Sequence, residues 1–153
     1  MATVQFPTQL SKDFYSRAKI AFPNEEYAIC LGRSLIGGNF RIEKLYFPTA
    51  RLNDQSPDRV DVQPGWFETA AEMAVTDGME VIGDIHSHCY EAIDEGGADT
   101  TPSKDDWKWA EAMSTVTFGK YRIMGIVRVQ KSREKVICSN QFWPAIELFK
   151  TIK

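Results

Sequence analysis

Two histidines lie close together in a stretch of the chain that has the pattern of a β-strand. His86 and His88 are the only histidines in the sequence, and they end the run MEVIGDIHSH at residues 79–88. Residues two apart on a strand point to the same face, so both imidazoles are aimed at one point. Imidazole is the commonest metal ligand among side chains. The pair therefore predicts a metal site, whereas a lone histidine is more often a hydrogen-bonded or exposed side chain.

A third ligand is expected, because a catalytic zinc site usually has three protein ligands and leaves the fourth position to water. Asp106 is the candidate, since it lies in the first turn of a helix that begins PSKDD, after the loop that leaves the histidine strand. Ser103 and Asp106 also have the spacing of a capping box, so the carboxylate can instead serve the helix end. Asp105 is interpreted as a first-turn acid that complements the helix dipole.

The motif HSH, followed by a helix start of the form PSxxD, resembles the zinc motif of the JAMM (JAB/MPN) metallopeptidases. In that family a glutamate opens the first strand, and glycines follow three and seven residues later. The counterpart here is EEYAICLG, with Glu25 seven residues before Gly32 and with Ala28 at the other glycine position. The order of elements over residues 8–142 is similar too. The resemblance implies one JAB/MPN metallopeptidase domain over residues 1–153, of the prokaryotic stand-alone type.

The resemblance also implies roles for the site residues. One catalytic Zn²⁺ would be held by the two histidines and Asp106, and it would activate a bound water. Glu25 would be the base that takes the proton of this water, with Glu26 as its competitor on the opposite face of the strand. Ser103 would donate a hydrogen bond to the oxyanion of the tetrahedral intermediate.

Cys89 departs from the family pattern, because it replaces the proline that usually follows the second histidine. A thiolate beside two histidines could ligate zinc, but strand alternation points this side chain to the opposite face.

A second departure is the length of the loop before the third helix. Fourteen residues separate His88 from Ser103, about twice the family's spacing, so Asp99 has the usual distance from His88 whereas Asp106 has the usual local context. A helix N-terminus fixes both Ser103 and Asp106, while Gly96 stands where the serine would otherwise fall. We predict Asp106 as the ligand, with Asp99 as the alternative, and residues 89–102 as a Gly-rich acidic loop with an inserted segment.

Periodicity and turn signals predict the elements that position these residues. Helices are expected from Thr8 to Pro23, from Pro64 to Gly78, from Ser103 onward and, as a short C-terminal helix, from Pro144. Strands are expected at 25–32, 40–48, 59–62, 79–88, 121–129 and 136–142, with a Gly37-Gly38 turn and a polar loop at 49–57. The buried faces of the first three helices are expected to be Leu10, Phe14, Ala18 and Ala21, then Phe67, Ala70, Ala71, Ala74 and Val75, then Trp107, Ala110 and Met113 or Ser114.

This order of elements predicts an α/β (α+β) fold. A curved mixed, mostly antiparallel sheet would be flanked by helices. The resemblance makes this an MPN/JAB-type, cytidine-deaminase-like architecture. The strand order is not predicted.

Composition is that of a globular domain, with 153 residues, 43% hydrophobic and 25% charged. The net charge is −3 and the 18 Lys and Arg are dispersed, so neither a nucleic acid nor an anionic membrane is expected as a partner. The three cysteines predict no disulfide framework. No secretion signal or spanning run is recognised, so a cytoplasmic location is expected.

The substrate is implied by the resemblance alone. Family members with this residue set cleave a peptide or isopeptide bond after the C-terminal tail of a ubiquitin-like protein, in deconjugation or precursor processing, and bind the tail as an extended strand. Two alternatives stay open: a metal-free MPN interaction scaffold, and a zinc amidohydrolase that acts on small peptide-like substrates. No oligomeric state is predicted.

Overall fold

The computed structural model describes residues 3–48, 64–91, 100–116, 121–131 and 136–144. Its elements, in chain order, are β1 (Val4–Gln5), α1 (Thr8–Ala21), β2 (Tyr27–Leu35), β3 (Asn39–Tyr46), α2 (Pro64–Thr76), β4 (Glu80–Glu91), α3 (Lys104–Val116), β5 (Ile123–Lys131) and β6 (Val136–Pro144).

All six strands form one sheet in the order β1-β3-β2-β4-β5-β6. The pairs β2–β3, β2–β4 and β5–β6 are antiparallel, whereas β1–β3 and β4–β5 are parallel. The predicted mixed, mostly antiparallel sheet with flanking helices is confirmed. The strand that carries both histidines, β4, lies in the interior of this sheet between β2 and β5.

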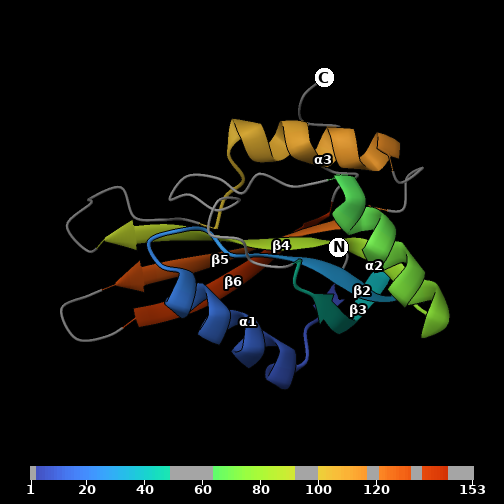
Figure 1. The fold of residues 1–153 in the computed structure, drawn as a ribbon, viewed down its shortest axis with the longest axis horizontal. Helices are drawn as coiled ribbons and strands as arrows, with labels where there is room; N and C mark the ends of the chain where they lie inside the picture. Colours follow the sequence, from blue (N-terminus) through green and yellow to red (C-terminus); the bar gives the residue numbers. More distant parts are fainter. Residues whose placement is uncertain (1–2, 49–63, 92–99, 117–120, 132–135, 145–153) are drawn as a thin grey trace.

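Helices cover both faces of the sheet, with α1 on one face and α2 and α3 on the other (Figure 1). Each face has its own apolar cluster. The face of α1 buries Phe14, Ala18, Ala28, Cys30, Phe40, Ile42, Leu45, Ile82, Ile85, Ile123, Val127 and Val129. The face of α2 and α3 buries Tyr27, Ile29, Leu31, Phe67, Ala70, Ala74, Val81, Ala110, Met113, Tyr121, Met124 and Ile126. The sheet is thus the middle of three layers.

Two glycines allow the strands around β4 to approach closely. A Cβ on Gly83 would lie 1.9 Å from the carbonyl oxygen of Ile123 in β5, and one on Gly32 would lie 1.9 Å from that of Arg41 in β3. Such separations are impossible for a real side chain. Gly32 is the glycine of the EEYAICLG motif, so the structure gives a packing reason for this part of the pattern.

Several predicted details are wrong. β2 begins at Tyr27 rather than at residue 25, so Glu25 and Glu26 precede the strand. β4 continues to Glu91, where a loop was predicted from residue 89, because these residues pair with β5. On α2, Ala71 is exposed and Val75 is 78% exposed, because the helix packs on the sheet through Phe67, Ala70 and Ala74, with Trp66 and Met73 partly buried beside them.

Other predictions fall partly or wholly outside the described residues: the polar loop 49–57, the strand 59–62, Asp99 and the C-terminal helix. Pro144, which was expected to start that helix, is the last residue of β6.

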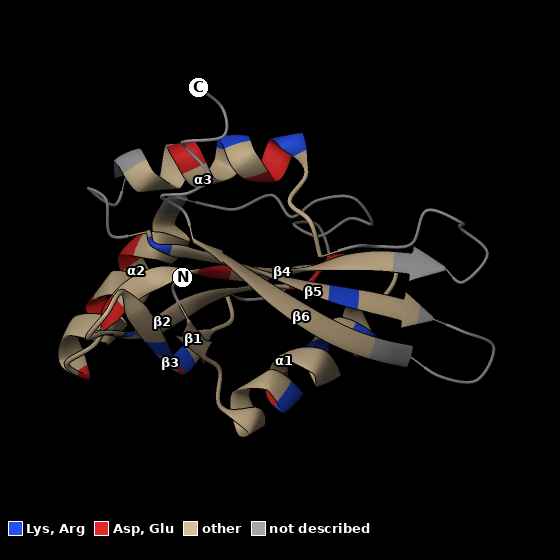
Figure 2. Ribbon diagram, turned by 180° about the vertical axis from the view of Figure 1, so that it is seen from behind, with Lys and Arg blue, Asp and Glu red and all other residues tan. Residues whose placement is uncertain are grey.

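Lys and Arg are spread over several helices and strands, alongside Asp and Glu (Figure 2). In the part of the chain that the structure describes, none of the helices is both long enough and apolar enough to cross a membrane.

Candidate metal centre

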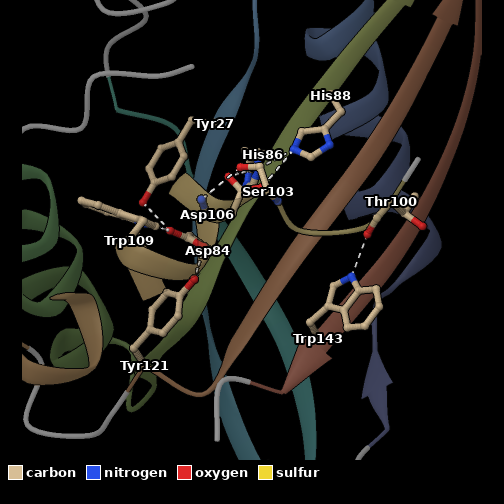
Figure 3. A network of polar contacts seen from close by, with 10 residues as sticks. All are labelled: Tyr27, Asp84, His86, His88, Thr100, Ser103, Asp106, Trp109, Tyr121 and Trp143. Carbon is tan, nitrogen blue, oxygen red and sulfur yellow. Dashed lines mark hydrogen bonds and ion pairs between the residues drawn. The ribbon is translucent and has the colours of Figure 1, made fainter. Parts of the chain in front are cut away.

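Three side chains from β4 and α3 converge on the face of the sheet that α3 covers (Figure 3). The Nε2 atoms of His86 and His88 lie 3.0 Å apart. Oδ1 of Asp106 lies 3.1 Å from Nε2 of His86, and Oδ2 lies 3.2 Å from Nε2 of His88. His86 is buried, while His88 and Asp106 are partly buried. The predicted pairing of the two histidines with Asp106 is therefore present in space.

The donor atoms of the three side chains lie close enough together to bind one metal ion. Ligands about 2.0–2.1 Å from zinc in tetrahedral geometry are about 3.3 Å from one another. The two Nε2 atoms are 3.0 Å apart, close to that value. The separations of 3.1 and 3.2 Å join two different oxygens of Asp106, Oδ1 to His86 and Oδ2 to His88. The three residues form a group that could hold a metal ion, and two imidazoles with one carboxylate would leave a fourth position for water.

The start of α3 fixes Asp106 through a reciprocal capping box. Ser103 Oγ accepts the backbone N–H of Asp106 at 3.1 Å, and Asp106 Oδ2 accepts the backbone N–H of Ser103 at 2.8 Å. The capping interpretation and the ligand interpretation are both compatible with this geometry, because the same carboxylate caps the helix and faces the histidines.

The electrostatics of the site favour a bound cation. Burial lowers the pKa of His86, but the hydrogen bond and charge of Asp106, aided by the charges of Glu25 and Asp84, raise this pKa to about 9. Burial raises the pKa of Asp106, yet hydrogen bonds from both histidines and from Ser103 hold it well below its usual range. The carboxylates thus supply negative charge that a metal cation would balance.

A family model described as prokaryotic homologs of the JAB domain matches residues 7–143. The chain belongs to this family. A search of curated protein sequences finds no match.

Solved structures are similar to this JAB-domain protein in fold. A protein from Desulfitobacterium hafniense has a TM-score of 0.60 and 22% identity, covering 93% of this chain and 84% of its own. A protein from Salinibacter ruber has a TM-score of 0.51 and 23% identity, covering 90% and 80%. A JAB1/MPN domain protein from Archaeoglobus fulgidus has a TM-score of 0.50 and 18% identity, covering 95% and 91%. At these identities the likeness is one of fold alone.

The JAB domain places Glu25 and Glu26 in different surroundings, although both are buried. Glu26 Oε1 accepts the backbone N–H of Tyr27, and Oε2 lies 3.9 Å from Nε of Arg17 in α1. The charge of Glu25 instead helps to raise the pKa of His86. The charge of Glu25 thus acts on His86, and its role as the base stays a prediction.

Cys89 faces away from the metal centre, as strand alternation predicts. Its Sγ donates to the carbonyl oxygen of Asn24 at 3.2 Å, and it lies 3.9 Å from Ser87 Oγ, on the side opposite to the histidines. Burial raises the pKa of this thiol to about 11. The alternative ligand Asp99 lies outside the described residues.

Asp84 was not predicted from the sequence, and it is fully buried in β4 on the same face as His86. Its Oδ2 accepts hydrogen bonds from Tyr27 Oη at 2.9 Å and from Trp109 Nε1 at 2.7 Å, and its Oδ1 accepts one from Tyr121 Oη at 2.6 Å (Figure 3). An acid within the apolar run VIGDIH, two residues before a predicted ligand, was the available signal.

Proposed function

We propose that this protein is a zinc-dependent peptidase that hydrolyses a peptide or isopeptide bond after the C-terminal tail of a ubiquitin-like protein. The observation that carries the proposal is the convergence of His86 Nε2, His88 Nε2 and the Asp106 carboxylate within 3.0–3.2 Å of one another. Buried Glu25 lies near enough to affect His86. Two imidazoles, one carboxylate and a nearby glutamate are the set that zinc-assisted hydrolysis requires.

Bound zinc would supply Lewis acidity, lowering the pKa of a coordinated water and polarising the substrate carbonyl. Glu25 accepts a proton from the attacking water as the water oxygen bonds to the carbonyl carbon. Glu25 then gives this proton to the nitrogen of the leaving amine as the C–N bond breaks. Burial of the Glu25 side chain limits exchange of this proton with bulk water.

Ser103 is suited to stabilise the negative charge that develops on the carbonyl oxygen. Its hydroxyl accepts the backbone N–H of Asp106, and a hydroxyl that accepts one hydrogen bond still carries a proton that it can donate. The side chain is exposed at the start of α3, where a substrate can reach it. A single oxyanion donor commonly contributes about 10²–10³-fold to turnover.

An extended tail could bind beside the metal ligands. Among the described strands, β4 pairs with β2 only as far as His86, and from His88 to Glu91 it pairs with β5 alone. Beside His88 this edge of β4 is covered by the segment before β2, because Ser87 N–H donates to the carbonyl oxygen of Glu26 and Cys89 Sγ donates to that of Asn24. An added strand would therefore pair with β4 only beyond Cys89. Main-chain hydrogen bonds to such an edge are a common way to bind an extended peptide.

The two alternative functions differ in what they require of the site. A metal-free scaffold needs no converging ligand set, so the geometry of His86, His88 and Asp106 argues against it. An amidohydrolase acting on small peptide-like substrates would use the same metal chemistry, and only substrate tests separate it from the proposed activity.

The test is hydrolysis of a ubiquitin-like protein whose tail is extended by a short peptide, read by mass spectrometry. We expect cleavage at the end of the tail by the zinc-loaded protein. Glu25→Gln should bind zinc normally but turn over about 10²-fold more slowly or worse. Glu26→Gln is the matched control, because it removes a neighbouring buried carboxylate that faces α1, and it should keep the activity.

Full activity in Glu25→Gln would overturn the assigned base. Cleavage of short peptides with no cleavage of the extended protein would move the substrate to the small-peptide class.

A further inference from the structure

Asp84 connects the two elements that carry the metal ligands. It lies on β4 two residues before His86, and it accepts the indole N–H of Trp109, which lies on α3 three residues after Asp106. We propose that Asp84 is a positioning residue, which holds α3 against β4 through Trp109 and so sets the affinity of the metal centre for zinc. This inference rests on the proposed zinc-dependent function.

The geometry gives α3 two points of attachment to β4. In one attachment, Asp106 lies opposite the two histidines. In the other, Trp109 donates a hydrogen bond to Asp84. Trp109 lies about one helical turn after Asp106 on α3, and Asp84 lies two residues before His86 on β4. One attachment would let the helix pivot about the metal ligands. Two attachments fix both the height and the rotation of α3, and hence the position of the Asp106 carboxylate.

The Asp84 carboxylate is itself held from three sides. Its partners come from β2 (Tyr27), α3 (Trp109) and the residue that precedes β5 (Tyr121), at 2.6–2.9 Å. All three partners are neutral donors, which suits an acceptor-only carboxylate with no water access. None of these three partners carries a positive charge that would cancel the negative charge of Asp84. This charge therefore favours a metal cation near His86.

A separate contact secures the chain just before α3. Trp143 Nε1 in β6 donates to the carbonyl oxygen of Thr100 at 2.7 Å (Figure 3). Thr100 Oγ1 donates to Gln141 Oε1 at 2.7 Å. This contact holds the entry to the helix but not its rotation. The Trp109–Asp84 hydrogen bond links the body of α3 to the histidine strand, beside the apolar packing of Ala110 and Met113.

A metal centre responds to small displacements, because ligands must be held within about 0.5 Å of their productive positions. Loss of groups that orient the ligands typically weakens metal binding about 10–100-fold. The Asp84 carboxylate accepts hydrogen bonds from Tyr27, Trp109 and Tyr121. Its effect on the ligands would therefore be transmitted by the position of α3 and by its charge.

The experiment measures the dissociation constant of zinc by competition with a fluorescent chelator, together with the melting temperature of the metal-free protein. Trp109→Phe keeps a ring packed near Phe67, whose centroid lies 6.1 Å from that of Trp109, but it removes the N–H. The matched control is Ile82→Val, which perturbs the core on the opposite face of the same strand, where Ile82 is 1% exposed.

We expect Trp109→Phe and Asp84→Asn each to weaken zinc binding about tenfold or more. Ile82→Val should lower the melting temperature but leave the zinc dissociation constant within about twofold. The double variant should bind zinc little more weakly than the worse single variant, because the hydrogen bond that Trp109→Phe removes ends on the carboxylate that Asp84→Asn changes.

If Trp109→Phe binds zinc as tightly as the Ile82→Val control, the proposed positioning role of Asp84 is wrong. The proposed zinc site itself would then stand. Wild-type protein that binds no zinc would overturn both the proposed function and the positioning role of Asp84 that rests on it.

Discussion

The carboxylate of Asp106 meets two structural demands at once. Oδ2 accepts the backbone N–H of Ser103 at 2.8 Å and lies 3.2 Å from His88 Nε2, while Oδ1 lies 3.1 Å from His86 Nε2. An ionised carboxylate has about four lone-pair sites, so capping the helix and binding a metal use different ones. The cap also orients the side chain before a metal arrives, which lowers the entropic cost of assembling the site.

The charge state of His86 gives a pH prediction at the residue scale. Its pKa in the metal-free protein is raised to about 9, so below that pH the bound proton competes with zinc. Zinc affinity should therefore rise with pH, by about tenfold per unit for this one proton, and level off near pH 9. Chelator competition at several pH values, corrected for protonation of the chelator, measures the slope; a flat profile between about pH 7 and 9 would contradict it.

Among single residues, the sequence predicted those whose chemistry follows from residue type and spacing. The i, i+2 histidines and the PSxxD helix start led to the three side chains that converge in space. Asp84 was missed because its importance depends on Tyr27, Trp109 and Tyr121, which come from distant parts of the chain. No local pattern brings such donors together.

At the scale of elements, β4 is the part on which the site depends most. It pairs with β2 on one side and β5 on the other, and the parallel pairing with β5 starts at Gly83↔Ile123, one residue before Asp84. The close approach at Gly83 therefore sets the register of the strand segment that carries Asp84, His86 and His88.

Gly83→Ala should be strongly destabilising, because the new Cβ would lie 1.9 Å from the Ile123 carbonyl oxygen, a backbone atom that cannot move aside. We expect a loss of about 3 kcal/mol or more in the free energy of unfolding, measured by denaturant titration. Gly65→Ala in α2 is the control, since nothing lies within 4 Å of its added Cβ; it should change stability by no more than about 1 kcal/mol. Equal effects of the two substitutions would refute the packing argument.

Element types were predictable where periodicity was strong, as in α1, α3 and β5. The first and last residues of the elements were less predictable. The polar, Gly-rich composition after His88 indicates a loop, but pairing with β5 extends β4 to Glu91. On α2 the small residue Ala71 and the apolar Val75 fit a helical stripe by type, yet the packing of the helix on the sheet leaves both exposed.

At the scale of the whole molecule, the candidate centre exists only because the sheet and one helix layer are assembled together. β4 supplies two of the candidate ligands and α3 supplies the third, while Glu25 lies in the segment before β2. The strand order that brings these parts together, with β4 between β2 and β5, follows from long-range pairing. Single-sequence patterns carry no record of such pairing, so the order could not be predicted.

The most direct test of the account is the zinc content of the purified protein, measured by elemental analysis. We predict about one zinc per chain in the wild type, in Asp105→Ala and in Asp99→Ala, and loss of the metal in His88→Ala and Asp106→Ala, because these two remove ligands. Zinc that persists in Asp106→Ala but is lost in Asp99→Ala, or wild-type protein that binds no zinc at all, would contradict the account.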